Sequence, residues 1–492
     1  MSFILALDQG TTGTTAALID AKTFAFVAKV NQEYPQIYPK PGWVEHNLND
    51  IWSSVKATVT AVLEKANVQA NMISFIGITN QRETTCAFDR SGQPLANAIV
   101  WQDRRTSEFC LKHKSQEPLL KSKTGLPLDP YFSATKMRWL LKNNSQVSSA
   151  ANNGQLLFGT IDTYLLYRLS GVHATEPSNA SRTLLYNLES GEWDDTLLDF
   201  FEVPKSSLAQ IQPSFGLFAK TKGLDFLPDN IPITGILGDQ QSALFGQAGH
   251  SKGSLKCTYG TGAFMLLNTG EQPVVSEHGL LTTVAYSHKG KTFFALEGSC
   301  YIAGAAVQWL RDNLKLIRSS SEVELLAKKV SNMDEMEHVM FLPFFTGIGS
   351  PHWQADAKAA IVGMTRDTSA EHLARACLEG IALSINDLAQ AMSADTKLKV
   401  SSMRVDGGAA ANDLLLELQA TFSELDVIRP KVIETTAYGA ALAAAMGAGE
   451  VDLNAIDKLW QEDKVFNPTP SQLPYTRQKT QLWQKTIKRL FL

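Results

Sequence analysis

Cysteine is scarce in this chain and forms no pattern. The 492 residues include five cysteines, and no two of them have C-x-x-C spacing: Cys86, Cys110, Cys257, Cys300 and Cys377. An odd number of scattered thiols argues against a disulfide framework and against a structural zinc site. Reduced and mostly buried thiols are the expected state.

An excess of positive charge is absent as well. Lys and Arg number 45 against 49 Asp and Glu, which gives a formal net charge of −4, and no dense basic run occurs. Proteins that bind nucleic acid usually present a basic face. We therefore expect no nucleic-acid partner.

Long apolar stretches are also missing. The Ala/Gly-rich segment Thr435–Gly449 is too short to span a bilayer. The N-terminal sequence MSFILALDQG has a short apolar run with no basic region before it, which is typical of a strand rather than a signal peptide. We expect no membrane insertion and a cytoplasmic location.

The length of the chain predicts two large domains, and each half opens in the same way. The apolar run Phe3–Leu7 leads into the Gly/Thr turn Asp8–Gly13, and Leu255–Tyr259 leads into Gly260–Gly262. A β-prone run follows each turn, which suggests a diverged internal duplication. We place the two domains at residues 1–248 and 249–492.

Further strands and helices alternate along both halves. Apolar residues at helical spacing predict helices at Asp50–Leu63 with Asn49 as cap, at Ala305–Leu316, from Ser369 onward and at Ala411–Phe422. Strands are predicted at Thr14–Ile19, Phe24–Val30, Ile73–Ile78, Ile233–Leu237, Ala263–Leu267 and Met403–Val405. This alternation indicates α/β domains with mixed sheets.

Three glycine turns are candidates for binding phosphate. Asp8–Gly13 offers backbone N–H groups and hydroxyls, although no Walker A lysine follows it. Tyr259–Gly262 repeats the theme, and Asp406–Gly408 precedes a predicted helix whose N-terminus would face phosphate. Any one of these turns could serve turn chemistry alone. Their occurrence together favours a triphosphate gripped from two sides.

Two carboxylates follow predicted strands. Asp8 is placed to hold Mg²⁺ through water, because Mg²⁺ favours carboxylates together with substrate phosphates. Asp239, after the strand Ile233–Leu237, is placed to act as a general base. Asp is also a favoured helix cap, and spacing alone does not choose between these roles for Asp239.

A dense polar stretch follows the predicted strand Ile73–Ile78. Strand ends in α/β folds open onto ligand crevices, so Arg82 and Glu83 are candidate binders; the alternative is an exposed surface ion pair. Trp101 and Tyr131 have polar neighbours, but isolated aromatics are more often core residues. His46 is interpreted as a structural or surface residue, since it belongs to no ligand-spaced cluster.

Several segments match one family in order through almost the whole chain. The sequence resembles the glycerol kinases of the FGGY carbohydrate kinase family. The matching segments are Asp8–Thr12 (DQGTT), Ile37–His46 (IYPKPGWVEH), Ile78–Thr85 (ITNQRETT), Asn97–Trp101 (NAIVW), Asp129–Phe132 (DPYF), Asn179–Thr183 (NASRT), Gly238–Gly246 (GDQQSALFG), Tyr259–Gly262 (YGTG), Gln308–Asp312 (QWLRD) and Val405–Ala409 (VDGGA). ITNQRET and PGWVEH are long enough to be specific to glycerol kinases.

The resemblance implies an α/β fold of two duplicated actin-like or hexokinase-like (ribonuclease H-like) ATPase domains with a cleft between them. It implies that glycerol is bound by Arg82, Glu83, Trp101, Tyr131, Asp239, Gln240 and Phe264. It implies that ATP is bound by Thr11, Thr12, Gly13, Thr14, Thr261, Gly304, Gln308, Gly408 and Asn412. In this chemistry Asp239 accepts the hydroxyl proton, Asp8 and Asp239 approach Mg²⁺, and the product is sn-glycerol 3-phosphate. Relatives are often dimers or tetramers, so a homo-oligomer is expected.

The chain departs from the family pattern at two places. Thr15 stands where many relatives carry a basic residue, so one cationic phosphate contact is missing. The stretch Lys220–Asn230 lacks the Gly/Arg-rich loop through which some bacterial relatives bind a sugar-bisphosphate inhibitor.

Other functions remain open at the level of sequence. A kinase for another polyol or ketose is the enzyme alternative, and the glycerol-kinase-specific segments count against it. An actin- or chaperone-like ATPase would have no use for Arg82, Glu83 and Trp101. A silent sugar-binding module would have no use for Asp8 and Asp239.

Overall fold

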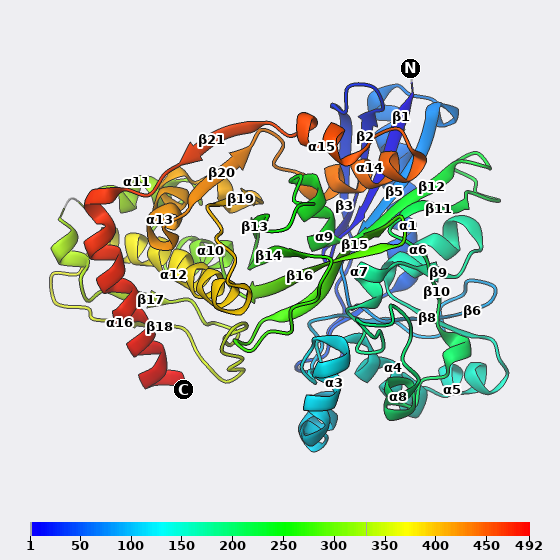
Figure 1. Cartoon of the computed structure of the whole chain (residues 1–492), viewed down its shortest axis with the longest axis horizontal. Helices are drawn as coiled ribbons and strands as arrows, with labels where there is room; N and C mark the ends of the chain where they lie inside the picture. The colour runs from blue at the N-terminus through cyan, green and yellow to red at the C-terminus, as the bar shows by residue number, and fades with distance from the viewer. Residues whose placement is uncertain (1, 331) are drawn as a thin grey trace.

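The computed structural model describes residues 2–330 and 332–492 and consists of two halves, each built on its own sheet (Figure 1). The first half carries a six-stranded sheet of order β11-β12-β5-β1-β2-β3. Its strands are β1 (Phe3–Gln9), β2 (Gly13–Asp20), β3 (Phe26–Glu33), β5 (Ile73–Asn80), β11 (Phe215–Lys220) and β12 (Pro232–Gly238).

The second half carries a seven-stranded sheet of order β15-β16-β14-β13-β19-β20-β21. Its strands are β13 (Leu255–Tyr259), β14 (Ala263–Gly270), β15 (Leu281–His288), β16 (Lys291–Cys300), β19 (Ser402–Asp406), β20 (Asp426–Pro430) and β21 (Glu462–Phe466). Short strand pairs complete the two halves: β4 (Glu45–His46) with β7 (Ala98–Ile99), β6 (Cys86–Asp89) with β8 (Leu156–Gly159), β9 (Ala174–Thr175) with β10 (Gln210–Ile211), and β17 (Met340–Leu342) with β18 (Ala360–Val362).

The two sheets repeat one topology, as the opening strands predict. β1 pairs antiparallel with β2 and parallel with β5, which pairs parallel with β12. In the same way β13 pairs antiparallel with β14 and parallel with β19, which pairs parallel with β20. Equivalent backbone hydrogen bonds close the two opening turns, Gly10 N–H to Gly13 O at 2.9 Å and Gly260 N–H to Gly262 O at 2.8 Å. The prediction of mixed α/β sheets is confirmed.

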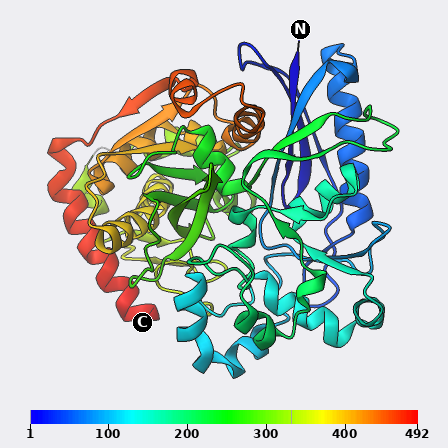
Figure 2. The same ribbon diagram turned by 45° about the vertical axis from the view of Figure 1, so that its right-hand side comes forward.

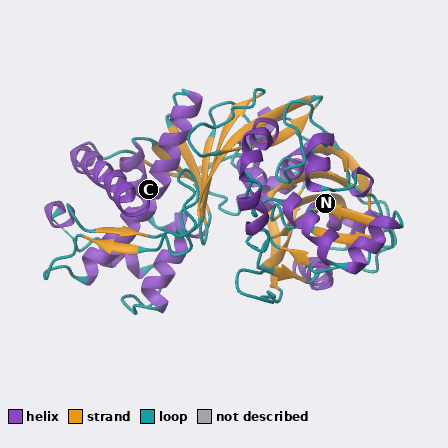
Figure 3. Ribbon diagram, turned by 90° about the horizontal axis from the view of Figure 1, so that it is seen from below, coloured by secondary structure: helices purple, strands orange, loops and turns teal. Residues whose placement is uncertain are grey.

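Helices cover the sheets of both halves (Figure 3). The first half contains α1 (Leu48–Ala66), α2 (Ser107–Lys112), α3 (Glu117–Thr124), α4 (Ser133–Asn143), α5 (Ser145–Asn152), α6 (Ile161–Ser170), α7 (Pro177–Ala180), α8 (Asp195–Phe201) and α9 (Asp239–Gly246). The second contains α10 (Gly304–Asp312), α11 (Glu322–Ala327), α12 (Ala370–Thr396), α13 (Asp413–Ser423), α14 (Thr435–Ala448), α15 (Leu453–Leu459) and α16 (Leu473–Phe491). The terminal helix α16 runs along the outer edge of the second half (Figure 2).

Several predicted element ends are wrong by a few residues. The cap of α1 is Asn47, whose side chain accepts from Asn49 N–H at 2.9 Å, so Asn49 lies inside the helix. The third strand begins at Phe26, because Phe24 adopts a left-handed φ of 57° in the preceding turn. α10 ends at Asp312, four residues before the predicted end, and α13 begins only at Asp413, after a 3₁₀ turn over Gly408–Ala411.

Helix α14 joins the halves by close backbone packing. It belongs to the second half of the sequence but packs on β1, β5 and β12 of the first sheet and on α9 (Figure 1). A Cβ atom at Gly439 would lie 1.9 Å from the carbonyl oxygen of Ser242, and one at Gly77 would lie 2.0 Å from that of Ala440. Glycine is therefore required on both sides of this contact. The Ala/Gly-rich composition of 435–449 serves helix packing.

A cluster of buried polar side chains is hydrogen-bonded to the backbone of the first glycine turn. The Tyr34 hydroxyl donates to Gly10 O at 2.5 Å, and Gln81 Nε2 donates to the same oxygen at 3.1 Å. His46 Nε2 donates to Gln36 Oε1 at 2.7 Å, and its Nδ1 faces Gln81 Nε2 at 3.4 Å. Burial lowers the pKa of His46 to about 4, so the ring is neutral near pH 7. His46 is structural, and the turn above it is held rigidly.

All five cysteines are free; Cys300 is half-buried and the other four are buried. Within the part of the chain that the structure describes, no helix has both the length and the apolar character needed to cross a membrane.

The contact between α9 and α14 yields a stability prediction. Gly439→Ala should lower the free energy of unfolding by about 2 kcal/mol, because the new methyl group forces two helix backbones apart. Urea unfolding followed by circular dichroism measures the change. Ala448→Gly, in the half-exposed last turn of the same helix, is the matched control and should cost about 1 kcal/mol or less. Full stability of Gly439→Ala would contradict the close packing.

The neutral, buried His46 yields a pH prediction. In the unfolded chain its imidazole takes up a proton below about pH 6.5, whereas in the folded protein it does so only near pH 4. The stability that depends on His46 is therefore complete above pH 6.5 and falls by up to about 3 kcal/mol toward pH 4. In His46→Gln, which cannot titrate, the loss over this window should be smaller by that amount. His338→Gln, at an exposed ring, should follow the parent; a parallel decline of parent and His46→Gln would refute the assignment.

Candidate active site

The carboxyl ends of strands in both sheets carry residues that the sequence predicts for the site. In the first half β1, β5 and β12 end at the turn of residues 10–12, at Arg82–Glu83 and at Asp239. In the second half β13 and β19 end at the turn of residues 260–262 and at Gly407. Ligand sites of open α/β sheets lie at such strand ends.

Arg82 is buried and is surrounded by carboxylates. Its Nη1 and Nη2 both donate to the carboxylate of Glu297, the second at 2.9 Å, and Nη1 also lies 3.2 Å from Gln241 Oε1. Its Nε lies 3.1 Å from Asp239 Oδ1. Burial by itself would lower the pKa of Arg82, but Glu297, Glu83 and Asp239 raise that pKa well above its usual value. The guanidinium is fixed in place and permanently charged.

Glu83 is held in a strained backbone conformation beside Arg82. Its φ of 59° lies in the left-handed region, which non-glycine residues adopt rarely and often at functional sites. Its Oε1 accepts from Arg182 Nε at 2.5 Å. Burial raises the pKa of Glu83 despite the opposing effect of Arg182 and Arg82. The alternative of an exposed surface ion pair is excluded, because Arg82 is 3% and Glu83 1% exposed.

Arg82, Glu83 and Asp239 belong to a charge cluster with two further members, Arg182 and Glu297. The sequence patterns assigned no function to either of these two residues. Arg182 lies in the NASRT segment, just after α7, and Glu297 lies in the interior of β16. Both are 0% exposed. A charged residue inside an otherwise apolar strand, as in Ala295-Leu296-Glu297, is the signal that could have found Glu297. Its partners lie more than 100 residues away, so no local pattern names them.

Aromatic side chains are the next group of residues predicted to bind glycerol. Trp101 and Tyr131 meet edge to face with ring centroids 5.6 Å apart, and Trp101 Nε1 donates to Thr11 Oγ1 at 2.9 Å. Tyr131 is buried, whereas Trp101 is half-buried. Phe264, also half-buried, pairs across the second sheet with Thr258. The bond to Thr11 connects a predicted glycerol residue with a predicted nucleotide residue.

Asp239 begins helix α9 and remains accessible. Gly238 is the N-cap, so the alternative of Asp239 as helix cap is wrong. Asp239 Oδ1 accepts from the Gln240 N–H at 2.7 Å, and its side chain is 30% exposed. The neighbouring Gln240 is buried, with its Oε1 accepting from Lys256 Nζ at 2.7 Å. Of these two predicted glycerol residues, Asp239 has the more accessible polar group.

The carboxylates predicted to approach Mg²⁺ influence each other. Burial raises the pKa of Asp8 to about 7, with further contributions from the charges of Asp239 and Glu434 that Lys29 opposes. Two carboxylates that repel each other in a cleft fit a divalent cation, whose charge would relieve the repulsion. The donor set of Asp8 and Asp239 thus suits Mg²⁺ with substrate phosphates as its other ligands.

A cavity of about 510 Å³ lies in the second half between the turn of residues 260–262, α10 and the segment 408–415. Five predicted nucleotide residues line it: Thr261, Gly304, Gln308, Gly408 and Asn412. Val307, Val323, Leu378 and Leu415 add an apolar surface. A cavity of this size, lined by both polar and apolar residues, suits a nucleoside phosphate. A Cβ at Gly304 would lie 2.7 Å from Gly260 O, so glycine lets α10 approach the turn.

The four predicted nucleotide residues of the first half lie in the first glycine turn and at the start of β2, and they do not line this cavity. Thr12 is exposed at the tip of the turn. Gly13 is needed for packing, since a Cβ there would lie 2.7 Å from Gln32 O. Thr14 is buried, and its Oγ1 is hydrogen-bonded to Ser54 Oγ at 2.7 Å. Nucleotide contacts by Thr11, Thr12, Gly13 and Thr14 stay predictions, and Thr14 has only its backbone to offer.

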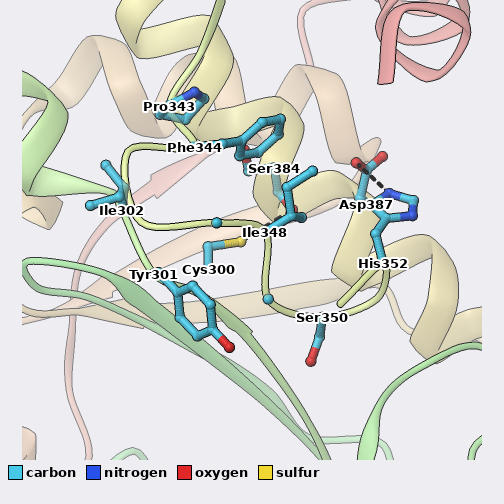
Figure 4. Close-up of a pocket in the computed structure, with 12 residues that line it drawn as sticks. Cys300, Tyr301, Ile302, Pro343, Phe344, Ile348, Ser350, His352, Ser384 and Asp387 are labelled. Atoms are coloured by element: carbon cyan, nitrogen blue, oxygen red, sulfur yellow. Dashed lines mark hydrogen bonds and ion pairs between the residues drawn. The ribbon is translucent and has the colours of Figure 1, made fainter. Parts of the chain in front are cut away.

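A second cavity beyond the end of β16 is much smaller. It is lined by Cys300, Tyr301, Ile348, Ser350, His352 and Asp387, with His352 Nε2 directed at Asp387 at 3.7 Å (Figure 4). Its volume of about 20 Å³ is close to that of one water molecule. This cavity cannot hold a polyol or a nucleotide.

Known proteins resemble the chain along its whole length. A glycerol kinase of Bdellovibrio bacteriovorus is 48% identical and one of Bacillus subtilis 46%, each over 99% of this chain and at least 98% of the relative. The solved glycerol kinase of Plasmodium falciparum with ADP superimposes with a TM-score of 0.92 at 36% identity, covering 100% of this chain and 99% of that one. A xylulose kinase of Lactobacillus acidophilus shares the fold, with a TM-score of 0.90 at 23% identity.

Two family models divide the sequence between them. The N-terminal domain of the FGGY family of carbohydrate kinases matches residues 3–246, and the C-terminal domain matches residues 255–448. These spans contain both glycine turns, the charge cluster and the cavity described above. The chain belongs to the FGGY family of carbohydrate kinases.

Proposed function

We infer that the protein transfers the γ-phosphoryl group of ATP to a terminal hydroxyl of glycerol, giving sn-glycerol 3-phosphate and ADP. This proposal rests mainly on the buried residues Arg82 and Glu83, which lie beside the accessible carboxylate of Asp239. The full-length relatives named glycerol kinase support this choice among the activities of the family.

Glycerol recognition follows from opposite hydrogen-bonding capacities. Arg82 only donates and the ionised Glu83 only accepts, so together they suit vicinal hydroxyls. A site built this way rejects ligands that leave its buried polar groups unpaired. Trp101, Tyr131 and Phe264 would cover the C–H side of the substrate, and Gln240 can still donate from its amide.

Phosphoryl transfer depends mainly on positioning. Asp239 would accept the proton of the attacking hydroxyl, and Arg82, with its Nε 3.1 Å from Asp239, would fix the direction of that carboxylate. Asp8 and Asp239 would hold Mg²⁺, which when bound neutralises charge on the phosphates. The glycine turns of residues 10–12 and 260–262 would close over the transferred group and exclude water from it.

Three broader assignments complete the proposal. Residues 1–248 would carry the glycerol site and base, and residues 249–492 most of the nucleotide site; the family spans 3–246 and 255–448 support this division. A homo-oligomer of two or four copies and a cytoplasmic location remain part of the proposal as what the resemblance to glycerol kinases implies. Sedimentation velocity on the purified protein tests the assembly.

Replacing the proposed base tests the chemistry. Asp239→Asn should lower kcat by about 10³-fold, because the amide cannot accept the proton. A coupled ADP-release assay measures turnover, and circular dichroism checks the fold. Asp225→Asn, at an exposed carboxylate of the same half, is the control and should leave kcat unchanged. Near-normal turnover of Asp239→Asn would refute the base assignment.

The choice of acceptor is tested with a substrate panel. With ATP and Mg²⁺, the kcat/KM for glycerol should exceed the values for xylulose and gluconate by at least about 10²-fold, because longer substrates misplace the hydroxyls that Arg82 and Glu83 bind. Dihydroxyacetone, which has a carbonyl in place of the central hydroxyl, should be intermediate. A pentulose preferred over glycerol would indicate a ketose kinase instead.

A further inference from the structure

The residues that bind the polyol in the proposed function are themselves held by a second pair of charges. Glu297 uses both carboxylate oxygens on Arg82 and also accepts from Arg182 Nη2 at 3.1 Å. Arg182 in turn donates from Nε to Glu83 at 2.5 Å. Positive and negative groups therefore alternate through the cluster, and two arginines balance two glutamates.

Glu297 is the one member of this cluster that comes from the second half. It lies on β16, whereas Arg82, Glu83 and Arg182 belong to the first half. It is 0% exposed, and its oxygens already serve the two arginines, so it offers nothing to a ligand directly. Its effect on a substrate must pass through Arg82.

The planar guanidinium of Arg82 makes this effect specific. A bidentate contact through Nη1 and Nη2 fixes the guanidinium plane and leaves Nε in an ion pair with Asp239 Oδ1 at 3.1 Å, although in the part of the chain that the structure describes this Nε has no aligned hydrogen-bond partner. Arg182 adds a second link, because its guanidinium carbon lies 5.6 Å from the Tyr131 ring centroid. Its Nη1 is buried and, within residues 2–330 and 332–492, has no hydrogen-bond partner.

A contribution to the folding stability of the protein does not by itself explain why such a cluster is buried. Each buried ion loses its hydration, and buried ion pairs often contribute no more than apolar residues of similar volume. The arrangement instead has the character of a site whose contacting groups are locked by supporting hydrogen bonds.

We propose that Glu297, together with Arg182, is a positioning residue for glycerol, which couples the orientation of Arg82, Glu83 and Asp239 to the seating of the second half against the first. This inference rests on the proposed function. It assigns the second half a part in polyol recognition as well as in nucleotide binding.

The test compares charge removal at Glu297 with a matched buried ion pair. Glu297→Gln should raise the KM for glycerol by about 100-fold and lower kcat, while ADP affinity by calorimetry changes less than about 3-fold. Glu379→Gln is the control, because Glu379 is 1% exposed and pairs with Arg375 within α12, away from the cluster. It should lose stability without a change in the KM for glycerol.

A double variant separates positioning from general damage. In Glu297→Gln/Arg182→Gln the remaining Arg82 and Glu83 balance each other, so the KM should rise less than the product of the two single effects. If Glu297→Gln does not fold, Glu297→Asp keeps the charge but is too short for both contacts and should still raise the KM at least 10-fold.

The outcomes separate this inference from the proposed function. A parent protein that phosphorylates no glycerol would overturn the proposed function. An active parent whose Glu297→Gln or Glu297→Asp variant keeps the parental KM, or whose Glu379→Gln variant shows the same rise, would overturn the positioning role alone.

Discussion

The rest of the site depends on the carboxylate of Glu297 meeting the guanidinium of Arg82 across the two halves. A charge buried at this depth would be strongly unfavourable without a partner, so each of these two residues requires the other. The same contact turns the Nε edge of Arg82 toward Asp239. In the proposed function, Arg82 would thus link glycerol binding to the position of the Asp239 carboxylate.

Around this contact the two halves are joined by backbone packing that allows little adjustment. α14 lies against β5, β12 and α9 with glycines at the closest points, and its buried alanines belong to a core cluster shared by both halves. Small residues allow the backbones to approach, and the close fit fixes the relative position of the helices. This packing therefore fixes the position of the first sheet, whose strand ends carry Asp8, Arg82 and Asp239.

The same topology occurs in both halves, but the surroundings of the two opening turns differ. Each sheet ends its first strand in a glycine turn, and each turn leads into an antiparallel second strand. In the first half the turn is supported by the neutral His46 cluster, whereas in the second half it borders the large cavity. Each half thus has a similar glycine turn, and in the proposed function the segments that carry Trp101 and Tyr131 would cover one side of a small polyol.

Local patterns were sufficient for much of this protein. Apolar runs ending in Gly/Thr turns predicted β1, β2, β13 and β14, and the order of motifs predicted the family and its two-domain fold, because these features depend on neighbours in the chain. The motifs also named Arg82, Glu83 and Asp239. Element ends such as the cap at Asn47 were missed, since Asn49 has the same capping chemistry and only the backbone conformation separates the two.

Only the tertiary structure decided how the named residues are held. Glu297 and Arg182 became visible when chain segments more than 100 residues apart were brought together, and no local pattern records such a contact. The structure also showed that Thr14 is hydrogen-bonded to Ser54, and it placed the predicted nucleotide residues of the second half around one cavity. Sequence determined which chemical groups are present and which strands carry them; burial and long-range pairing decided which of those groups can reach a ligand.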